Sequence, residues 1–176
     1  SVEEFVPDRI RVSSVLNQES YKPGETAQLK VNAMNFFGPP AGNRNVEAEI
    51  QVKYRPFRAE KFDDYNFNLA NQFAIGDKEV RETKTDAEGN VTINYKIPEL
   101  YANMGMLQAN FYTTVFDETG RPVSRVSNAN IYTQDVFYGI QQDWSYYFPL
   151  NQTVNFGVVS VNKNGEAGNA KAKIEV

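Results

Sequence analysis

Alternation of apolar and polar residues is the feature that most constrains the fold of this chain. Four runs carry it, and within each run core-type residues alternate with polar or solvent-tolerant ones. Because successive side chains of a β-strand point to opposite faces, each run predicts a strand with one face in a core. The predicted core faces are Ala27, Leu29, Val31 and Ala33; Val46, Ala48, Ile50, Val52 and Tyr54; Val91, Ile93, Tyr95 and Ile97; and Leu107, Ala109, Phe111, Thr113 and Val115.

Turn-forming residues separate these runs. Gly, Pro, Asp and Asn, which favour the backbone angles of reverse turns, are concentrated there. With the apolar patterns at 10–14 and 123–131, the second of them less regular, we estimate about seven strands in all. That count is typical of an immunoglobulin-like or fibronectin III-like antiparallel β-sandwich, so the predicted fold class is all-β. The turn segments are residues 22–25, 37–42, 86–90 and 117–122.

Two places break the regular pattern. Met34 and Phe36 place apolar residues on the opposite face of the run that begins at Ala27, which predicts a β-bulge. Residues 56–78 contain apolar residues at spacings compatible with a helix face, but they also contain several Asn residues, which are poor in helix interiors. We predict an ordered insertion into the sandwich there.

An internal repeat divides the chain. Tyr21-Lys22-Pro23 is matched by Tyr147-Phe148-Pro149, and Ala41-Gly42-Asn43 is matched at the same separation by Ala167-Gly168-Asn169. An alternating strand follows each Ala-Gly-Asn triplet. We therefore predict a complete sandwich over residues 1–134 and the N-terminal part of a second, truncated sandwich over residues 135–176. The apolar face of that second part needs a cover, from the first domain, another copy or further sequence.

The composition excludes several classes of function. The chain contains neither His nor Cys, so it has no histidine base, no thiol nucleophile and no Cys/His zinc site. Its net charge is -4 and its Lys and Arg residues are scattered, which argues against nucleic acid as a partner. No apolar run approaches the roughly 20 residues that cross a bilayer. We expect no enzyme activity and no cofactor.

The acidic residues are weak candidates for a site. Three carboxylate pairs, Asp63-Asp64, Glu3-Glu4 and Glu47 with Glu49, are predicted to be exposed rather than catalytic. The turn at 86–90 alternates acidic and amide residues as calcium ligands do, but it lacks the closing Glu of an EF-hand loop. A hairpin turn is the prediction here, and no metal site is expected.

Two aromatic groups are the candidate partner surfaces. Phe62, Tyr65 and Phe73 lie in the insertion, where they could bind a partner or sugar, or cap one end of the sandwich. Trp144 and Tyr146 lie where the second part begins, and a contact between domains is the favoured interpretation for them.

The motifs resemble the macroglobulin (MG) domains of bacterial α2-macroglobulins. Tyr21-Lys22-Pro23-Gly24-Glu25, followed by Asn35-Phe36-Phe37-Gly38-Pro39-Pro40-Ala41, is similar to a pattern of that family. Residues 2–10 resemble its inter-domain strand, residues 117–125 its last hairpin, and residues 131–140 the entry into a following MG domain.

The resemblance implies a parent protein that traps proteases. In that family a bait segment is cut, the domains rearrange and a thioester captures the protease. The thioester needs a Cys, which this chain lacks, so the chain would be scaffold. Implied partners are neighbouring MG domains and, through the parent, target proteases. The implied location is extracytoplasmic, in the periplasm or at the cell surface, with membrane contact only through a lipid anchor elsewhere in the parent.

Two other functions fit the pattern. An immunoglobulin-like repeat of a bacterial surface adhesin shares the turn chemistry, although such repeats are shorter and lack an insertion like 56–78. An accessory domain of a secreted glycosidase would use the aromatic insertion to bind sugar.

Overall fold

The computed structural model describes residues 8–69, 75–141, 150–151, 153 and 155–173. The regular secondary structure of the described chain is β-strand, apart from two short 3-10 turns, and no helix that could span a membrane occurs in these ranges. The strands are β1 (Ile10–Leu16), β2 (Ser20–Tyr21), β3 (Thr26–Asn35), β4 (Asn45–Tyr54), β5 (Tyr65–Asn66), β6 (Lys78–Lys84), β7 (Asn90–Lys96), β8 (Met106–Phe116), β9 (Pro122–Tyr132), β10 (Phe137–Gln141) and β11 (Val158–Val161), and the 3-10 turns are η1 (Glu60–Phe62) and η2 (Glu99–Tyr101).

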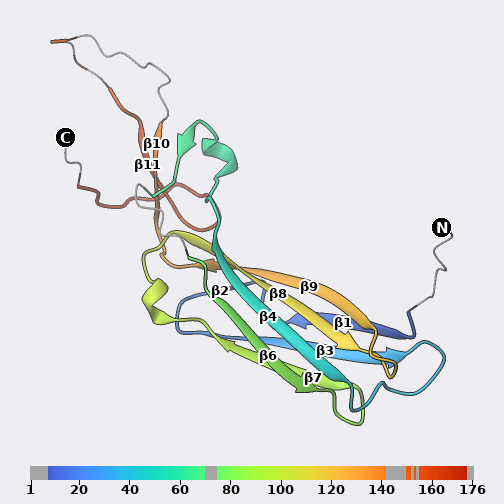
Figure 1. Cartoon of the computed structure of the whole chain (residues 1–176). Helices are drawn as coiled ribbons and strands as arrows, with labels where there is room; N and C mark the ends of the chain where they lie inside the picture. The colour runs from blue at the N-terminus through green and yellow to red at the C-terminus, as the bar shows by residue number, and fades with distance from the viewer. Residues whose placement is uncertain (1–7, 70–74, 142–149, 152, 154, 174–176) are drawn as a thin grey trace.

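Two sheets form the body of the molecule. A five-stranded sheet has the order β2-β9-β8-β4-β6, and a three-stranded sheet has the order β1-β3-β7. All their pairings are antiparallel except the short parallel contact of β2 with β9. The sheets lie face to face in an elongated sandwich, and a third small sheet, β11-β10-β5, extends from one end (Figure 1). The predicted all-β sandwich is confirmed.

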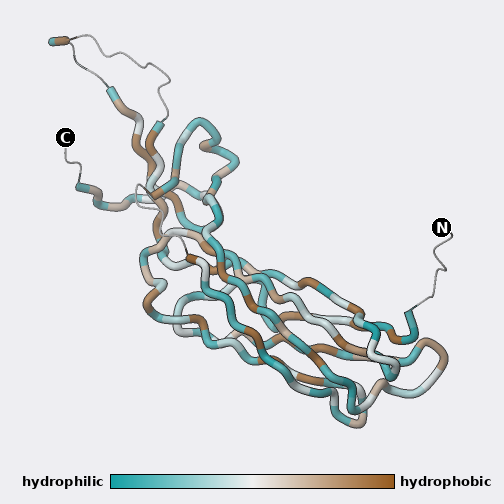
Figure 2. Tube along the Cα trace, in the orientation of Figure 1, coloured by the Kyte–Doolittle hydropathy of each residue, from teal (hydrophilic) through white to brown (hydrophobic). Residues whose placement is uncertain are grey.

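The core lies between the two sheets, where the alternation predicted it. The inward residues of β3, β4 and β8 are buried, except that Tyr54 at the end of β4 is half-buried, and hydrophobic and hydrophilic positions alternate along these strands in Figure 2. Tyr95 of β7 meets Phe111 of β8 edge to face, with ring centroids 6.2 Å apart, so side chains of the two sheets interdigitate. Burial of these side chains, each worth about 1.5–3 kcal/mol when complete, is what holds the sheets together.

The predicted bulge at Met34 is absent. β1 and β3 pair without interruption from Ile10 opposite Asn35 to Leu16 opposite Leu29. Met34 and Phe36 lie on the outer face, where the guanidinium of Arg11 sits 5.0 Å from the centroid of the Phe36 ring. A long charged side chain that covers the aromatic ring lets an outward apolar residue keep the regular register.

Strand β6 was not predicted, because its sequence lacks the alternation of apolar and polar residues that marks the other strands. Lys-Glu-Val-Arg-Glu-Thr-Lys contains one apolar residue, Val80, whose side chain is 49% exposed. β6 is the edge of the five-stranded sheet, and charged edge strands discourage pairing with other molecules. The polar sequence therefore fits the position, although it carries no alternation.

The turn at 86–90 connects the two sheets rather than the two strands of a hairpin. It leads from β6 of the five-stranded sheet to β7 of the three-stranded one. The Asp86 carboxylate accepts hydrogen bonds from the N–H groups of Glu88 and Asn90 at 3.0 and 2.8 Å, which is the chemistry of a tight turn. Gly89 has a φ of +78°, and a Cβ there would lie 2.2 Å from the carbonyl oxygen of Ala33.

A second acidic turn closes the β8–β9 hairpin. Asp117 is buried, and its carboxylate accepts hydrogen bonds from the N–H of Thr119, the hydroxyl of Thr119 and the N–H of Arg121, at 2.7, 2.7 and 2.9 Å. Desolvation alone would raise the pKa of Asp117, but these hydrogen bonds outweigh it, so that its pKa lies below the ordinary value of 3.8. The ionised carboxylate is thus favoured by folding.

Gly89→Ala should destabilise the sandwich far more than Gly120→Ala. Gly120 also has a positive φ, of +82°, but nothing lies within 4 Å of a Cβ there. We expect a loss of about 1 kcal/mol in the free energy of unfolding for Gly120→Ala, from backbone strain alone. For Gly89→Ala the clash with a backbone carbonyl adds to that strain, and we expect about 3 kcal/mol or more. Urea titration followed by tyrosine fluorescence measures both values, and equal losses would contradict this account of Gly89.

Asp117→Asn should destabilise the protein at neutral pH and have little effect in acid. The Asn side chain can accept the same N–H bonds, but it lacks the charge. Because the pKa of Asp117 is lowered by folding, the stability it contributes is present above the unfolded pKa and is lost as the pH falls through the folded pKa, below 3.8. Unfolding free energies of the two proteins, measured from pH 7 down to about pH 2.5, should therefore converge in acid. A constant difference across that range would rule out a charge effect.

Candidate functional site

A second apolar cluster lies beyond the end of the main core, and we call it the junction cluster. It brings together the insertion, the end of the sandwich and the two strands that follow. No residue of the main core belongs to it. Its buried members are Phe57, Ala59, Phe67, Met106, Phe137 and Val161, and Phe62, Tyr65, Tyr132 and Val159 pack around them.

Aromatic rings form the centre of the junction cluster. Phe57 of the insertion stacks on Phe137 of β10, with ring centroids 3.9 Å apart and planes inclined by 7°. Phe67 meets Phe57 edge to face at 5.3 Å, and Tyr132 meets Phe137 edge to face at 6.2 Å. Such ring pairs each add about 0.5–1.5 kcal/mol beyond the burial of their area. The insertion and β10 are therefore held together by packing, not by the backbone alone.

The insertion also adds a strand to the small sheet. β5 pairs antiparallel with β10, with Ile140 opposite Asn66 and Gln141 opposite Tyr65. The side-chain amide of Gln141 donates to the carboxylate of Asp64 at 3.0 Å. β10 is thereby paired with β11 on one side and, at Ile140 and Gln141, with β5 on the other. Figure 1 shows the insertion beside the β10–β11 pair at the end of the molecule opposite the N-terminus.

Glycine makes this close contact possible at two positions. A Cβ on Gly139 would lie 2.7 Å from the Phe67 ring, and a Cβ on Gly157 would lie 2.8 Å from the hydroxyl of Tyr65. Both distances are shorter than van der Waals contact, so a side chain here would push the insertion away from β10.

The segment between β9 and β10 is anchored at consecutive residues. The Thr133 hydroxyl donates to the carbonyl of Gly105 at 2.6 Å and accepts from the N–H of Met104 at 2.8 Å. The side-chain oxygen of Gln134 accepts from the N–H of Gly105 at 3.1 Å. Little rotational freedom is left at the exit from the sandwich.

An ion pair continues this anchoring at the surface. The ammonium of Lys22 lies 2.9 Å from the carboxylate of Asp135. The hydrogen bond and charge of Asp135 raise the pKa of Lys22, and the same contact lowers the pKa of Asp135. Both side chains are exposed, so that solvent and salt screen the pair and it contributes little stability.

The structure places two of the five predicted surface residues in this region. The rings of Phe62 and Tyr65 meet edge to face at 5.7 Å, at the margin of the junction cluster rather than over the main core. Because Met106 and Tyr132, at the end of the sandwich, belong to this cluster, the predicted cap and the predicted partner surface both stay predictions. Phe73, Trp144 and Tyr146 lie outside the described residues, and their roles stay predictions.

The central residues of the junction cluster were not predicted as site residues. Phe57 follows the helix-breaking Pro56, and Phe137 begins the Phe-Tyr-Gly-Ile run at the entry to the second part. Gly139, which follows Phe137 and Tyr138, was the available signal in the sequence, because a glycine within a strand marks a place where another segment approaches closely.

The carboxylates form ion pairs and hydrogen bonds of the kind that stabilise a fold rather than the arrangement of a catalytic site. Glu49 pairs with Lys78 at 2.7 Å, and Asp64 is bonded to Gln141. In the part of the chain that the structure describes, no group of three or more acidic side chains could hold a metal ion. The junction cluster can hold the sandwich and the strands that follow it in one orientation.

Comparison with known proteins identifies relatives of this architecture. The family model described as the bacterial alpha-2-macroglobulin MG5 domain matches residues 8–132. The alpha-2-macroglobulin of Pasteurella multocida (strain Pm70) is 27% identical over 146 residues, which are 80% of this chain and 8% of the relative. The alpha-2-macroglobulin homolog of Yersinia pestis is 27% identical over 148 residues, which are 81% and 7% of the two. The chain thus spans less than a tenth of the length of these relatives.

Solved structures share the fold. Trypsin-activated alpha-2-macroglobulin from Escherichia coli superposes with a TM-score of 0.67 at 18% identity, over 93% of this chain and 12% of that one. Salmonella alpha-2-macroglobulin reacted with methylamine gives 0.68 at 18% identity, over 94% and 12%.

Gly139→Ala should loosen the junction cluster while leaving the main core intact. The new methyl group would displace the buried ring of Phe67, and we expect a local loss of about 1–3 kcal/mol. Gly168→Ala is the matched control, because nothing lies within 4 Å of a Cβ there. Amide hydrogen exchange should accelerate in β5 and β10 of Gly139→Ala and stay unchanged in β3 and β8. Unchanged exchange in β10 would show that the close approach of Phe67 is unimportant.

Proposed function

The chain belongs to the bacterial alpha-2-macroglobulin family as an MG5 domain, and on that premise we propose that it is a scaffold module of a parent protein that traps proteases. The match over residues 8–132 is the observation that carries this proposal. As a domain of an alpha-2-macroglobulin-like protein, it would have other MG domains as its neighbours, and target proteases would be partners of the parent as a whole.

The junction cluster supports the scaffold role. Stacked rings, a shared strand pair and an anchored connection make the sandwich and the segment after it move together. A trap that closes after one cut needs modules that transmit a displacement, because a loose joint would absorb it. The insertion at 56–78 is thus a clamp on the next module rather than a sugar-binding surface.

The chemistry of trapping would lie elsewhere in the parent. A thioester needs a Cys, and this chain has none. MG domains of this family are non-catalytic modules, and we extend this to the chain itself: it should have no enzyme activity and need no cofactor. We also propose an extracytoplasmic location, with any lipid anchor outside these residues.

The test compares the full-length parent with the 176-residue chain alone. Each is incubated with proteases of several classes, and residual activity is measured on a large protein substrate and on a short peptide. The parent should suppress cleavage of the large substrate while sparing the short peptide, because a trapped protease keeps a working active site. The isolated chain should suppress neither.

Two outcomes would contradict the proposal in different ways. If the parent spares the large substrate with every protease, the trapping function is wrong. If the isolated chain inhibits a protease on its own, the chain is an inhibitor domain and not a scaffold. A parent that carries Gly139→Ala, with Gly168→Ala as its control, tests whether a firm junction is needed for trapping.

A further inference from the structure

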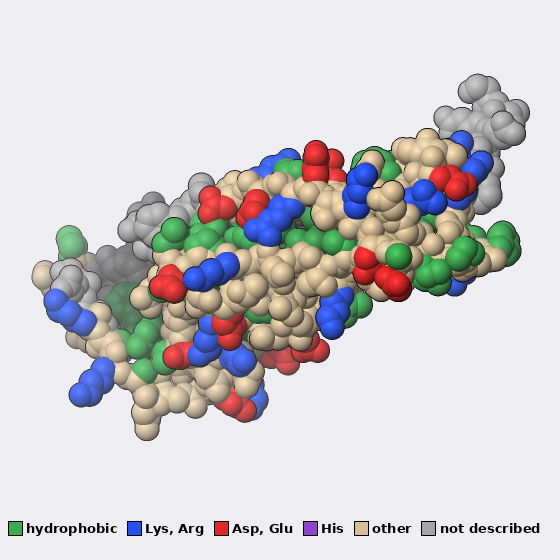
Figure 3. Space-filling model, turned by 90° about the horizontal axis from the view of Figure 1, so that it is seen from below, with side chains coloured by type: hydrophobic (Ala, Val, Ile, Leu, Met, Phe, Trp, Pro, Cys, Tyr) green, Lys and Arg blue, Asp and Glu red, His purple; other side chains and the backbone are tan. Residues whose placement is uncertain are grey.

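Hydrophobic side chains are exposed at the end of the sandwich opposite the junction cluster. The loop between β3 and β4 extends beyond the sheets there, and hydrophobic side chains gather at this end of the space-filling view (Figures 1 and 3). The side chain of Phe37 is 100% exposed, and that of Phe36 is 42% exposed. We call residues 36–40 the tip loop, and the first four of them border a groove that Arg9 and Glu118 also line.

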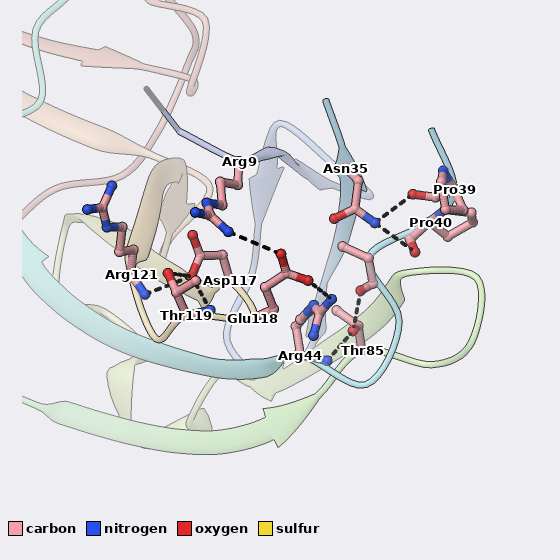
Figure 4. Close-up of polar contacts among 11 residues, drawn as sticks. Arg9, Asn35, Pro39, Pro40, Arg44, Thr85, Asp117, Glu118, Thr119 and Arg121 are labelled. Atoms are coloured by element: carbon pink, nitrogen blue, oxygen red, sulfur yellow. Dashed lines mark hydrogen bonds and ion pairs between the residues drawn. The ribbon is translucent and has the colours of Figure 1, made fainter. Parts of the chain in front are cut away.

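The tip loop is held in place by hydrogen bonds. The N–H and the side-chain amide of Asn35 both donate to the carbonyl of Pro39, at 3.2 and 2.9 Å, and the N–H of Phe36 donates to the carbonyl of Arg9 at 3.1 Å. Beside the loop, Glu118 lies 3.3 Å from Arg9 and 3.5 Å from Arg44 (Figure 4). The exposed rings are therefore displayed on a fixed frame, which costs less entropy on binding than a flexible loop would.

The second part of the chain contains a loop of the same construction. β10 and β11 pair antiparallel, as β1 and β3 do, and the loop after β11 repeats two backbone hydrogen bonds of the tip loop. In the tip loop the N–H of Asn35 donates to the carbonyl of Pro39 at 3.2 Å. In the second loop the N–H of Asn162 donates to the carbonyl of Glu166 at 3.0 Å. The N–H of Ala41 donates to Ala33, and the N–H of Gly168 donates to Ser160.

These two bonds align the two loops, although Gly165 has a positive φ, of +76°, and Gly38 does not. Asn35 corresponds to Asn162 and Gly38 to Gly165, one residue out of step with the Ala-Gly-Asn match in the sequence. Phe36 and Phe37 therefore correspond to Lys163 and Asn164.

The second loop shows where such a loop docks. A Cβ on Gly165 would lie 3.2 Å from the Cβ of Ala59, so the loop backbone rests on the insertion of the preceding sandwich. The ammonium of Lys163 lies 5.8 Å from the centroid of the Tyr132 ring, over the last strand of that sandwich. Lys163 also shares a groove there with Arg55 and Phe57. The loop after β11 thus contacts the junction cluster of the module before it.

By this internal equivalence we infer that the tip loop docks on the end of the MG domain that precedes this one in the parent protein. Phe36 inserts there into a groove equivalent to the one that Lys163 lines, and Phe37 lies at the same contact, between Phe36 and Gly38. This inference rests on the proposed function, in that it takes the parent to be an array of MG domains. To the proposed function it adds the surface that makes the contact, the residues that form this surface and the domain that they contact.

The chemistry of the occupant follows from the difference between the two loops. Lys163 is polar and lines a groove that contains Arg55, Asn130 and an aromatic ring. Phe36 in the same position needs an apolar groove, since a buried ring gains nothing from unpaired polar groups. The end of the preceding domain should therefore present aliphatic or aromatic side chains at the positions of Arg55 and Asn130.

Thiol labelling tests whether the tip loop is covered. The chain has no Cys, so Phe37→Cys provides a single thiol, and Val126→Cys, exposed on β9, is the matched control. In the isolated chain the two thiols should react with a maleimide at similar rates. In the full-length parent the labelling of Phe37→Cys should slow on the order of tenfold or more, while that of Val126→Cys does not change. Equal rates for Phe37→Cys in the parent and in the isolated chain would overturn the inference.

Two further measurements identify the occupant without relying on that substitution. Hydrogen exchange of the unmodified proteins should show slower exchange at residues 36–41 in the parent than in the isolated chain. In the parent, Gly38→Cys, at the position of Gly165, combined with a Cys at the position in the preceding domain that corresponds to Ala59 should form a disulfide under mild oxidation. Protection that appears in the isolated chain as its concentration rises would mean that a second copy is the partner, and would overturn the inference. No protease takes part in these readouts, so their failure is distinct from a failure of the trapping function.

Discussion

The burial of every second side chain between two sheets is the constraint on which the rest of this structure depends. It fixes the register of β3, β4, β7 and β8, because a slip by one residue would turn each apolar face to water. Once the register is fixed, the turns at both ends of the sandwich have fixed positions. The sandwich itself therefore holds the backbone at each end in place, whichever neighbouring segment packs against that end.

The two ends of the sandwich present different kinds of contact surface to neighbouring segments. At the end that leads onward, the insertion supplies Phe57 and β5, which clamp the following hairpin by stacking and by strand pairing. At the other end, a short loop held by Asn35 displays Phe36 and Phe37. A module built in this way has a receiving end and an inserting end, so that modules of one kind can follow each other head to tail. Small changes in either surface would alter the angle between neighbours without disturbing the core.

The glycines at the junction connect sequence to function most directly. Gly139 and Gly157 pack against Phe67 and Tyr65 at distances that no Cβ could tolerate. Neither has the positive φ of a turn glycine such as Gly89, so their use is close approach rather than backbone freedom. The sequence separates them only in part: Gly89 lies in a predicted turn and Gly139 follows two aromatic residues, but the rings that approach the junction glycines come from a distant segment.

The sequence by itself determined the strands with an apolar face, the turns between them and the absence of imidazole and thiol chemistry, because alternation and composition are local properties of the chain. It also carried the resemblance to MG domains, which the match over residues 8–132 confirmed. Only the tertiary structure decided that the turn at 86–90 crosses between sheets, that the polar β6 forms an edge and that no bulge occurs at Met34. It likewise decided that Phe57 meets Phe137 and that β5 joins β10. These contacts join segments that are far apart in the chain, and neither partner's local pattern specifies the other.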